Sequence, residues 1–483
     1  MIPSIDNNIN LKSKNFIRQT NNNNLSFQAT PKAFTKGTKF LDGFLKSQEN
    51  LSSTRFIQGT LTNWFPKAVL SRSFIDFSEF TFLEFLESGI FYFAAPFFGE
   101  HLFRNKLFKA VQPKNIKDTV TKNLSKSLDE IKSSKALDSV MKNRLTATKA
   151  GVVLACITVP ALEYALGFAK NLFTLKVFKV SDFNNVANLS KEKTENKEQQ
   201  NRVETHSKSV LKKMGLLSVA GIASGLALSA FGHKSRVLGK FSEALLEPGE
   251  QISKLLHKLG IKSEGTDNFL KDYLKLDFVN NNGKLSLSKG QLAVTCITGL
   301  FGYSSAAKDR GKLDFYEVWT RVPLVVLYTI FGSAVLDAGF KKILADKGKY
   351  PELIKRNAKG VIENVPTRKE LPAIAEKLSK LNKTSVDDEL AKLIKQKAVI
   401  TGVPYLFSLV TMGFVLSAVS RIWTKYRYNQ QQKAATQQKV QQPQDFVKLS
   451  PTFQENFILF TQIRFYFQRM ITKDLRNILL LRL

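Results

Sequence analysis

Cysteine and histidine are scarce in this 483-residue chain, which contains two cysteines and four histidines. Cys156 and Cys296 lie far apart, each inside an apolar run, and neither has a second cysteine nearby for a CxxC metal or redox site. Two cysteines also cannot build a framework of several disulfides. We therefore expect both to be small buried side chains, and the sequence predicts no metal site and no cofactor.

Recognisable enzyme motifs are absent as well. The chain has no GxxxxGK[ST] phosphate-binding loop, no HExxH zinc motif and no GxSxG nucleophile elbow. The four histidines are scattered along the chain. His101 lies in one segment with Glu84, Glu87 and Glu100, for which a polar helix face at the membrane interface is preferred over a metal site. We predict from these absences that the protein is not an enzyme.

Acidic residues are few compared with basic ones. The chain has 40 Asp and Glu against 72 Lys and Arg, which gives a formal net charge of +32 and an isoelectric point near 9.9. Such a charge is typical of proteins that bind a polyanion, either nucleic acid or the anionic face of a membrane. The chain is also rich in Asn and Phe, so a codon bias of the genome explains the lysines equally well. The charge alone leaves both explanations open.

Long stretches without any charge are what the chain does have. Ala398–Ser420 holds 23 consecutive uncharged residues and Met214–Gly232 holds 19, whereas a helix needs about 20 apolar residues to cross a bilayer core. The first of six apolar segments has a much shorter charge-free core, Ser88–Gly99, so it either crosses the bilayer or lies at its surface. The six segments are Phe80–Phe103, Ala150–Ala169, Met214–Gly232, Gly290–Ala307, Val322–Phe340 and Ala398–Ser420.

These segments predict an all-α, polytopic helical membrane protein with about four to six transmembrane helices joined by amphipathic basic helices. The membrane is either a bacterial inner membrane or an organellar membrane. Residues 1–60 lack the continuous apolar stretch of a signal peptide and are expected to be a disordered polar tail. The other expected regions are membrane repeat 1 (61–180), a linker with helix 214–232 and a helical insert (181–290), membrane repeat 2 (291–428), and a Gln-rich linker with an interfacial amphipathic tail (429–483).

A short motif occurs twice and favours an internal duplication. Residues 72–79 (RSFIDFSE) and residues 310–317 (RGKLDFYE) share the form R-x-x-[IL]-D-F-x-E. Each copy precedes an apolar segment, and a basic helical stretch then leads to a further apolar segment that opens with Lys-Ala, at Lys149 and at Lys397. The aspartate of the motif precedes that lysine by a similar distance in the two copies. The charged residues of the two copies are Arg72, Asp76, Glu79, Arg310, Asp314 and Glu317.

Two interpretations of the motif are open, and the structural one is preferred. In that interpretation Asp76 and Asp314 cap the N-termini of two helices, and Glu79 and Glu317 reach back to the caps. In the functional interpretation, the repeated arginines and carboxylates line a polar site shared by two pseudo-symmetric halves. The repeats are parallel if the four apolar segments between the copies all cross the membrane, and inverted if the first only lies on its surface.

Charged residues within the apolar segments are the other candidate site residues. Glu163 and Asp337 each lie in the C-terminal half of such a segment, where an ionisable group costs roughly 2.5–3.5 kcal/mol on insertion scales. A functional role is one explanation. The preferred explanation is a neighbouring lysine near the end of the helix, such as Lys170 or Lys341.

Gly221 and Gly225 form a small-residue pair in the third apolar segment. Glycines spaced four apart let helix backbones approach closely, either within one chain or between copies in a homo-oligomer. The expected partner of the whole chain is a lipid bilayer, with anionic lipids under the basic helices. Nucleic acid is a disfavoured partner because of the long apolar runs.

The sequence thus predicts an integral membrane protein with a non-enzymatic role in organising a membrane or anchoring a partner. The alternative is a small-solute transporter or channel built from two duplicated halves, which the carboxylates within the apolar segments and the repeated motif favour. A third class, a soluble helical nucleic-acid binder whose apolar runs are core helices, is disfavoured by the length of the run Ala398–Ser420.

Overall fold

The structure is a computed structural model that describes residues 35–48, 63–90, 97–190, 195–281, 284–358 and 360–440. Apart from loops and one short hairpin, these residues are helical, which confirms the predicted predominance of helix. They belong to one unit that ends at Tyr428; of a second unit, Asn429–Leu483, only the end of helix α19 is described.

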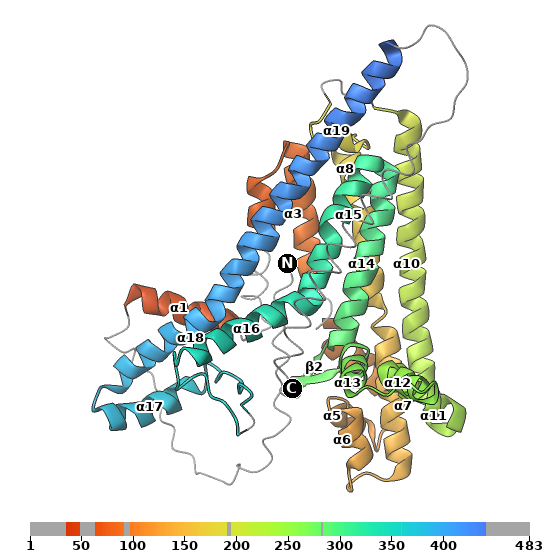
Figure 1. The fold of residues 1–483 in the computed structure, drawn as a ribbon. Coiled ribbons are helices and arrows are strands. Elements are labelled where there is room, and N and C mark those ends of the chain that lie inside the picture. Colours follow the sequence, from red (N-terminus) through yellow and green to blue (C-terminus); the bar gives the residue numbers. More distant parts are fainter. Residues whose placement is uncertain are drawn as a thin grey trace. The chain divides into compact units, whose positions relative to one another are not determined.

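The helices follow one another along the chain with short connections (Figure 1). The first group is α1 (Lys36–Gln48), a helix at residues 63–69, α3 (Phe74–Gly89), the π-helix η2 (Phe97–Leu107), α4 (Phe108–Ala110), α5 (Lys117–Asn123), α6 (Leu128–Ser133), α7 (Ser139–Ala155), α8 (Thr158–Phe178) and α9 (Phe183–Val186). The middle group is α10 (Lys197–Phe231), the 3-10 helix η3 (Gly232–Lys234), α11 (Arg236–Leu246), α12 (Pro248–Lys258), α13 (Glu264–Tyr273) and the strands β1 (Val279–Asn281) and β2 (Lys284–Ser286). The last group is α14 (Lys289–Arg310), α15 (Lys312–Leu327), η4 (Tyr328–Gly332), α16 (Ser333–Asp346), α17 (Leu371–Asn382), α18 (Val386–Ser408), η5 (Leu409–Val415) and α19 (Leu416–Val440).

Helices α3, α7, α8, α10, α14 and α15 form a central bundle (Figure 1). Helix α10 packs along both α7 and α8, and α14 packs against α8 and α15. Glu79 on α3 contacts Thr174 near the end of α8, whereas Ile90 shares a hydrophobic cluster with Val159 near its beginning. Helix α3 therefore runs antiparallel to α8.

Two further contacts fix the directions of the remaining helices. Asn171 on α8 bonds to Ala306 on α14, and Glu163, two turns earlier, lies beside Gly299, so α8 and α14 run parallel. Helix α15 follows α14 after the single residue Gly311 and turns back along it. Because α3 is antiparallel to α8 and α15 is antiparallel to α14, helices α3 and α15 point in the same direction.

Small residues allow the close approach of α10 to its neighbours. Gly225 on α10 faces Gly151 on α7, and a methyl group on either glycine would overlap the backbone of the other. Gly221 faces Leu154 and Ile157 in the same manner. The predicted glycine pair therefore packs two helices of the same chain, which is the intramolecular alternative.

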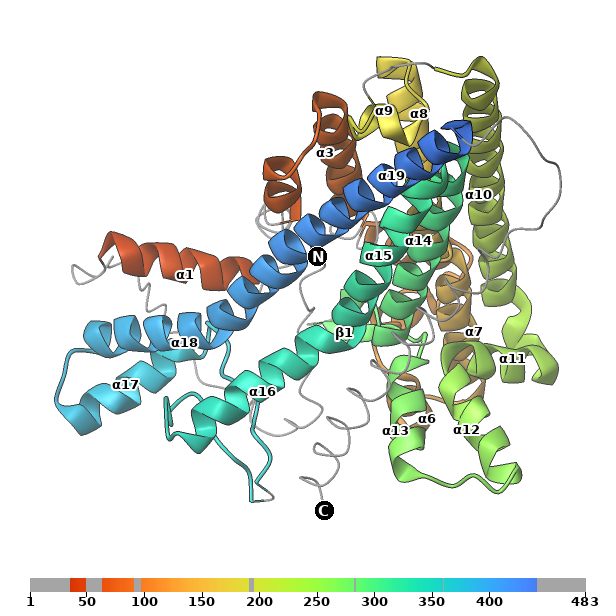
Figure 2. The same ribbon diagram turned by 45° about the horizontal axis from the view of Figure 1, so that its top comes forward.

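A second core joins α1, α16, α17 and α18, which lie together in Figure 2. Leu45 from α1 is buried in it, together with Leu371 from α17 and Leu393 from α18. Lys36–Gln48 was expected within the disordered tail, and this apolar contact is the reason that it is an ordered helix.

Helices α11, α12 and α13 and the hairpin form the insert between α10 and α14 (Figure 1). Strands β1 and β2 pair antiparallel, with Val279 opposite Ser286. Leu246 at the end of α11 and Leu285 in β2 are buried in the same cluster as the ends of α7 and α10. The insert is thereby attached to one end of the bundle.

Four helical stretches are long and apolar enough to cross a membrane, judged by length and composition alone. They contain the second, third, fifth and sixth predicted segments, so the described residues support the lower end of the predicted four to six. Helix α14 holds the fourth segment, and α3 and η2 hold the described part of the first. These helices are not long and apolar enough to be counted as membrane-crossing by the same criteria. The four stretches are Ser139–Phe178, Lys197–Lys234, Lys312–Asp346 and Val386–Gln437.

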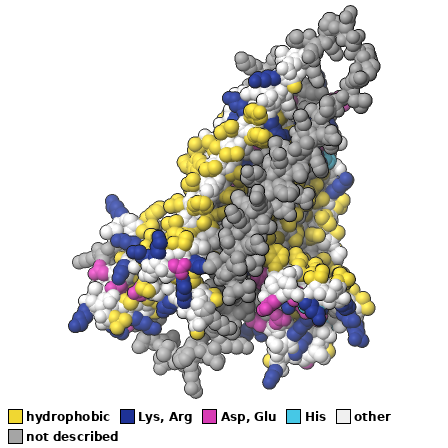
Figure 3. Space-filling model, viewed as in Figure 1, with side chains coloured by type: hydrophobic (Ala, Val, Ile, Leu, Met, Phe, Trp, Pro, Cys, Tyr) yellow, Lys and Arg dark blue, Asp and Glu magenta, His cyan; other side chains and the backbone are white. Residues whose placement is uncertain are grey.

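In three of these four stretches few residues are fully buried by the described part of the chain. The buried share of the most apolar part is 17% in Lys197–Lys234, 6% in Lys312–Asp346 and 22% in Val386–Gln437, against 61% in Ser139–Phe178. Figure 3 shows one face, on which hydrophobic side chains lie between ends where Lys and Arg gather.

The predicted linker and the Gln-rich segment are also more ordered than expected. Residues 197–213 form the first half of α10 instead of a flexible linker, and Glu204 there pairs with Lys176 on α8. The Gln-rich stretch continues α19 as far as Val440. Residues 1–34 and 441–483, which hold most of the predicted polar tail and the predicted interfacial helix, lie outside the described residues.

Candidate functional site

The two copies of the motif meet at the N-terminal ends of α3 and α15. The guanidinium of Arg72 donates to both carboxylate oxygens of Glu317, with Nη1–Oε2 at 2.8 Å and Nη2–Oε1 at 3.0 Å. In the reverse sense, Nη1 of Arg310 donates to Oε2 of Glu79 at 3.0 Å. Each arginine therefore pairs with the glutamate of the other copy, 245 and 231 residues away.

Each arginine also contacts the aspartate of its own copy. Nε of Arg72 lies 3.2 Å from Oδ2 of Asp76, and Nε of Arg310 lies 3.4 Å from Oδ2 of Asp314. The ring of Phe183 stacks between the two halves of this network, 5.3 Å from the guanidinium carbon of Arg72 and 5.8 Å from that of Arg310. The aromatic face favours both cations.

The capping interpretation is wrong, because neither Asp76 nor Asp314 is the N-cap of its helix. The N-cap of α3 is Ser73, whose hydroxyl accepts from the backbone N–H of Asp76. The N-cap of α15 is Gly311, which has no side chain to accept a hydrogen bond. Asp76 does accept from a backbone N–H, that of Arg72, but Glu79 and Glu317 are engaged in ion pairs between the copies.

A later helix of each half, α8 in the first and α19 in the second, makes matching contacts with the network. Thr174 on α8 donates to Glu79, and Thr424 on α19 lies against Glu317. Lys170 on α8 lies 3.6 Å from Glu79. Each half thus supplies a hydroxyl from its second long helix to the glutamate of its own motif.

The same two helices also reach the opposite copy. Nδ2 of Asn171 on α8 donates to the backbone carbonyl of Ala306 on α14, at 2.9 Å. Nη2 of Arg421 on α19 donates to the backbone carbonyl of Lys67, in the helix before α3, at 3.3 Å. Both carbonyls belong to the helix that precedes a motif, so this contact too is exchanged between the copies.

The Lys-Ala pairs that open the later apolar segments have equivalent surroundings. Lys149 is buried, and its amine donates to the backbone carbonyls of Leu124 and Lys126. Lys397 is buried too, and its amine donates to the backbone carbonyl of Pro366. In each case a buried lysine bonds to the chain that precedes its own helix. Lys149 has an additional partner in Asp277, 2.7 Å away.

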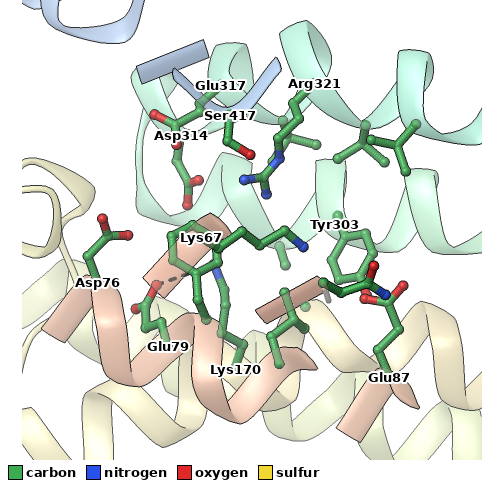
Figure 4. A pocket seen from close by; sticks show the side chains of 18 of the residues that line it. Lys67, Asp76, Glu79, Glu87, Lys170, Tyr303, Asp314, Glu317, Arg321 and Ser417 are labelled. Carbon is green, nitrogen blue, oxygen red and sulfur yellow. Dashed lines mark ion pairs between the residues drawn. The ribbon is translucent and has the colours of Figure 1, made fainter. Parts of the chain in front are cut away.

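A cavity of about 110 Å³ lies beside the network, between the helix at residues 63–69, α3, α8, α14, α15 and the start of α19 (Figure 4). Further charged groups on its walls are Lys67, Lys170, Glu87 and Arg321. Five of the six charged motif residues line it, namely Arg72, Asp76, Glu79, Asp314 and Glu317. Charged residues from both copies of the motif therefore line one cavity.

The two other predicted carboxylates lie outside this cavity. Glu163 is buried behind its wall and accepts from the hydroxyl of Tyr303 at 3.1 Å, while Lys170 is engaged with Glu79 instead. Asp337 pairs with Lys341 at 2.6 Å, one turn away on α16, as the structural explanation expected.

Sequence reasoning missed Lys67, Arg321 and Ser417, which also line the cavity. Lys67 forms an ion pair with Glu84, and the ring of Phe80 lies 5.3 Å from the guanidinium carbon of Arg321. Arg321 is a lone cation just before an apolar run, which is the one signal that could have marked it.

Comparisons with family models, with curated proteins and with solved structures find no match to this chain. What the site does must therefore be inferred from its own geometry.

Proposed function

We propose that this chain is a multi-pass integral membrane protein whose two duplicated halves enclose a solute-binding cavity, and that it carries a small polar solute across the membrane. The observation that carries the proposal is the reciprocal exchange of arginine–glutamate pairs at the wall of the cavity. Buried ion pairs are a costly way to stabilise a fold, because hydrophobic replacements of similar volume are often as stable. A polar site shared by two halves is a role that accounts for them.

Uncovered apolar surface supports the membrane setting. Leu216 on α10, Val335 on α16 and Ile422 on α19 are 60%, 62% and 69% exposed. Leaving a large apolar side chain in water instead of apolar surroundings costs about 1.5–3 kcal/mol. A hydrocarbon solvent removes this cost along all three uncovered stretches at once.

Alkaline carbonate extraction tests this setting. The protein is expected to stay in the membrane pellet. Release into the supernatant, together with monodisperse behaviour in buffer without detergent, would overturn the membrane assignment and the carrier proposal with it.

The duplication is supported by contacts that are exchanged between the halves and by the common direction of α3 and α15. Since the motif helices run in one direction, the repeats are parallel, with a pseudo-two-fold axis along the helices as in carriers built from parallel repeats.

Proteoliposomes test the carrier activity directly. We expect the reconstituted protein to take up at least one of four labelled probes, namely phosphate, acetate, alanine and rubidium. Glu317→Gln should lower that uptake at least about tenfold, because it leaves the Arg72 guanidinium without its main partner. Asp337→Asn, outside the cavity, is the matched control and should leave uptake unchanged. No uptake of any probe by the wild-type protein would overturn transport.

A role in organising or anchoring a membrane is the second candidate, and the insert supports it. Helices α11–α13 expose apolar side chains such as Val237, Leu255 and Leu259, next to the end of the apolar α10. Amphipathic helices of this kind lie in the interface of a bilayer. This role predicts that the reconstituted protein passes no solute but clusters or reshapes anionic liposomes, as measured by light scattering and electron microscopy.

A further inference from the structure

Unpaired hydrogen-bond donors gather on the side of the cavity that α15 and α19 form, with Arg321 and Ser417 on its wall and Arg421 behind the wall. Nη1 of Arg321, Oγ of Ser417, and Nε and Nη1 of Arg421 are buried and have no hydrogen-bond partner within the described part of the chain. Ser417 is fully buried and Arg421 is only 6% exposed. These are four donor atoms on three neighbouring side chains.

Their directions converge on one region of the cavity. Figure 4 shows Arg321 and Ser417 extending into the cavity from one side, and Lys67 extending toward Arg321 from the other. Phe80 holds the two arginines in place, because its ring lies 5.3 Å from the guanidinium carbon of Arg321 and 5.0 Å from that of Arg421. Two cations, Lys67 and Arg321, therefore face a space into which the free hydroxyl of Ser417 also extends.

The cations of this cluster differ in their ion pairs. Lys67 is paired with Glu84, and Arg421 lies 3.7 Å from Asp76, which is also bonded to Arg72. No ion pair joins Arg321 to any carboxylate among the residues for which the structure gives contacts. The positive charge of its guanidinium is thus available to a bound group.

Unpaired buried donors of this kind are rare in folded proteins, and each carries a desolvation cost. A guanidinium presents its N–H groups in a fork that matches the two oxygens of a carboxylate or phosphate. A hydroxyl and an ammonium group supply further donors to the same oxygens. The cavity volume of about 110 Å³ gives room for several water molecules, which a small anion would replace.

We infer that this cavity binds a small, free oxyanion, held by Arg321, Ser417 and Lys67 with Arg421 behind them. This inference names the chemical class of the solute. It rests on the proposed function, because the solute must reach the cavity from water. The anion completes the hydrogen bonds of donors that are otherwise unpaired, and it lies beside the exchanged ion pairs of the two motifs.

Calorimetric titration of the full-length protein in detergent tests the inference. The probes are inorganic phosphate, sulfate and acetate, with chloride for comparison. At least one oxyanion should bind, and chloride should bind more weakly than that oxyanion. Arg321→Gln should weaken oxyanion binding at least about tenfold and Ser417→Ala by a smaller factor, because a charged donor contributes more than a neutral one.

Arg321→Lys and Arg356→Gln are the controls. The first keeps the charge and should retain part of the binding, which also shows that the site still folds. The second alters a distant arginine that pairs with Asp346, and it should bind as the wild type does. Wild-type binding by Arg321→Gln and Ser417→Ala would overturn the inference, as would an absence of oxyanion binding. Binding of a short-chain phosphatidylglycerol alone would overturn it too, because the occupant would then be a lipid headgroup.

The two proposals fail separately. Oxyanion binding without uptake into proteoliposomes would retain the binding site and overturn the carrier. Uptake of alanine or rubidium without oxyanion binding would retain the carrier and overturn the oxyanion site.

Discussion

Helices α8 and α15–α16 are both apolar enough to cross a membrane, yet their surroundings in the chain are opposite. The apolar part of the stretch that contains α8 is 61% buried, and that of α15–α16 is 6% buried. Helix α8 carries Glu163, Asn171 and Thr174, whose partners lie on α3 and α14. Polar partners on several sides mark a helix that is surrounded by protein. Length and mean hydropathy are similar for the two stretches and do not separate them.

The cavity lies where these two environments meet. Its α3 and α8 walls belong to the buried side, and its α15 and α19 walls belong to helices whose outer faces are uncovered. Four predictions test this division, from the largest expected effect to the smallest.

The largest effect is expected from the ion pairs between the motifs. Arg72→Gln or Glu317→Gln should each lower the free energy of unfolding by about 3–5 kcal/mol, because each leaves a buried charge without its partner. The double variant should lower the free energy of unfolding by less than the sum of the two single variants. The same non-additivity is expected for Arg310 and Glu79. Unfolding by SDS titration in mixed micelles measures both cycles.

Glu376→Gln is the control for that cycle. It removes an exposed pair with Lys380 on α17, which should change the same free energy by no more than about 0.5 kcal/mol. Additive effects at Arg72 and Glu317 would show that the two halves are not coupled through this pair.

A smaller effect is expected from the glycine contact on the buried side. Gly225→Val should lower the free energy of unfolding by about 1–3 kcal/mol, because the valine side chain would overlap the backbone of α7 at Gly151. Gly215→Val is matched to it in chemistry and helix, but no atom of the described residues lies within 4 Å of the added carbon. Equal melting temperatures of the two variants would contradict the packing of α10 on α7.

The sequence alone revealed the repeated motif and six apolar segments, four of which lie in the long apolar helices, because both are local patterns. It could not predict which arginine pairs with which glutamate. The partners lie in opposite halves of the chain, and the same residue types at the same spacing also describe a capped helix N-terminus. Ser73 is the N-cap of α3, a position that a motif read by charge alone does not reveal.

Other residues of the cavity could not be predicted because each is isolated in the sequence. Lys67, Arg321 and Ser417 lie in three separate segments and meet only through the packing of α15 and α19 against the first half. Helix α1 was missed for a related reason: its apolar residues stabilise it only where Leu45 is buried against α18.

The third prediction concerns the pH dependence of anion binding at the border of the two environments. Burial, with repulsion from Arg321 and Arg421, lowers the pKa of Lys67 to about 7. Glu84 and Glu87 on α3 are the acids that face it. The amine is charged below that pKa and neutral above it, so binding should weaken as the pH rises through about 7.

Sulfate is the suitable probe, because its own charge does not change near neutral pH. We expect sulfate binding, measured by calorimetry between pH 6 and pH 8.5, to weaken about tenfold when the charged donor is lost. In Lys67→Met the binding should be weak throughout and should no longer depend on pH in this range. A wild-type protein with pH-independent binding would exclude Lys67 as an anion ligand.

The smallest effect is expected on the uncovered side. Val335→Ala on α16 removes apolar atoms that contact solvent or lipid and no protein core, so the free energy of unfolding in micelles should change by no more than about 0.5 kcal/mol. Leu166→Ala on α8, where the side chain is buried, should cost about 2–5 kcal/mol in the same assay. If Val335→Ala were as costly as Leu166→Ala, another part of the protein or a second copy would have to cover α16. The uncovered face would then be a protein interface, and the contrast between the two helices would disappear.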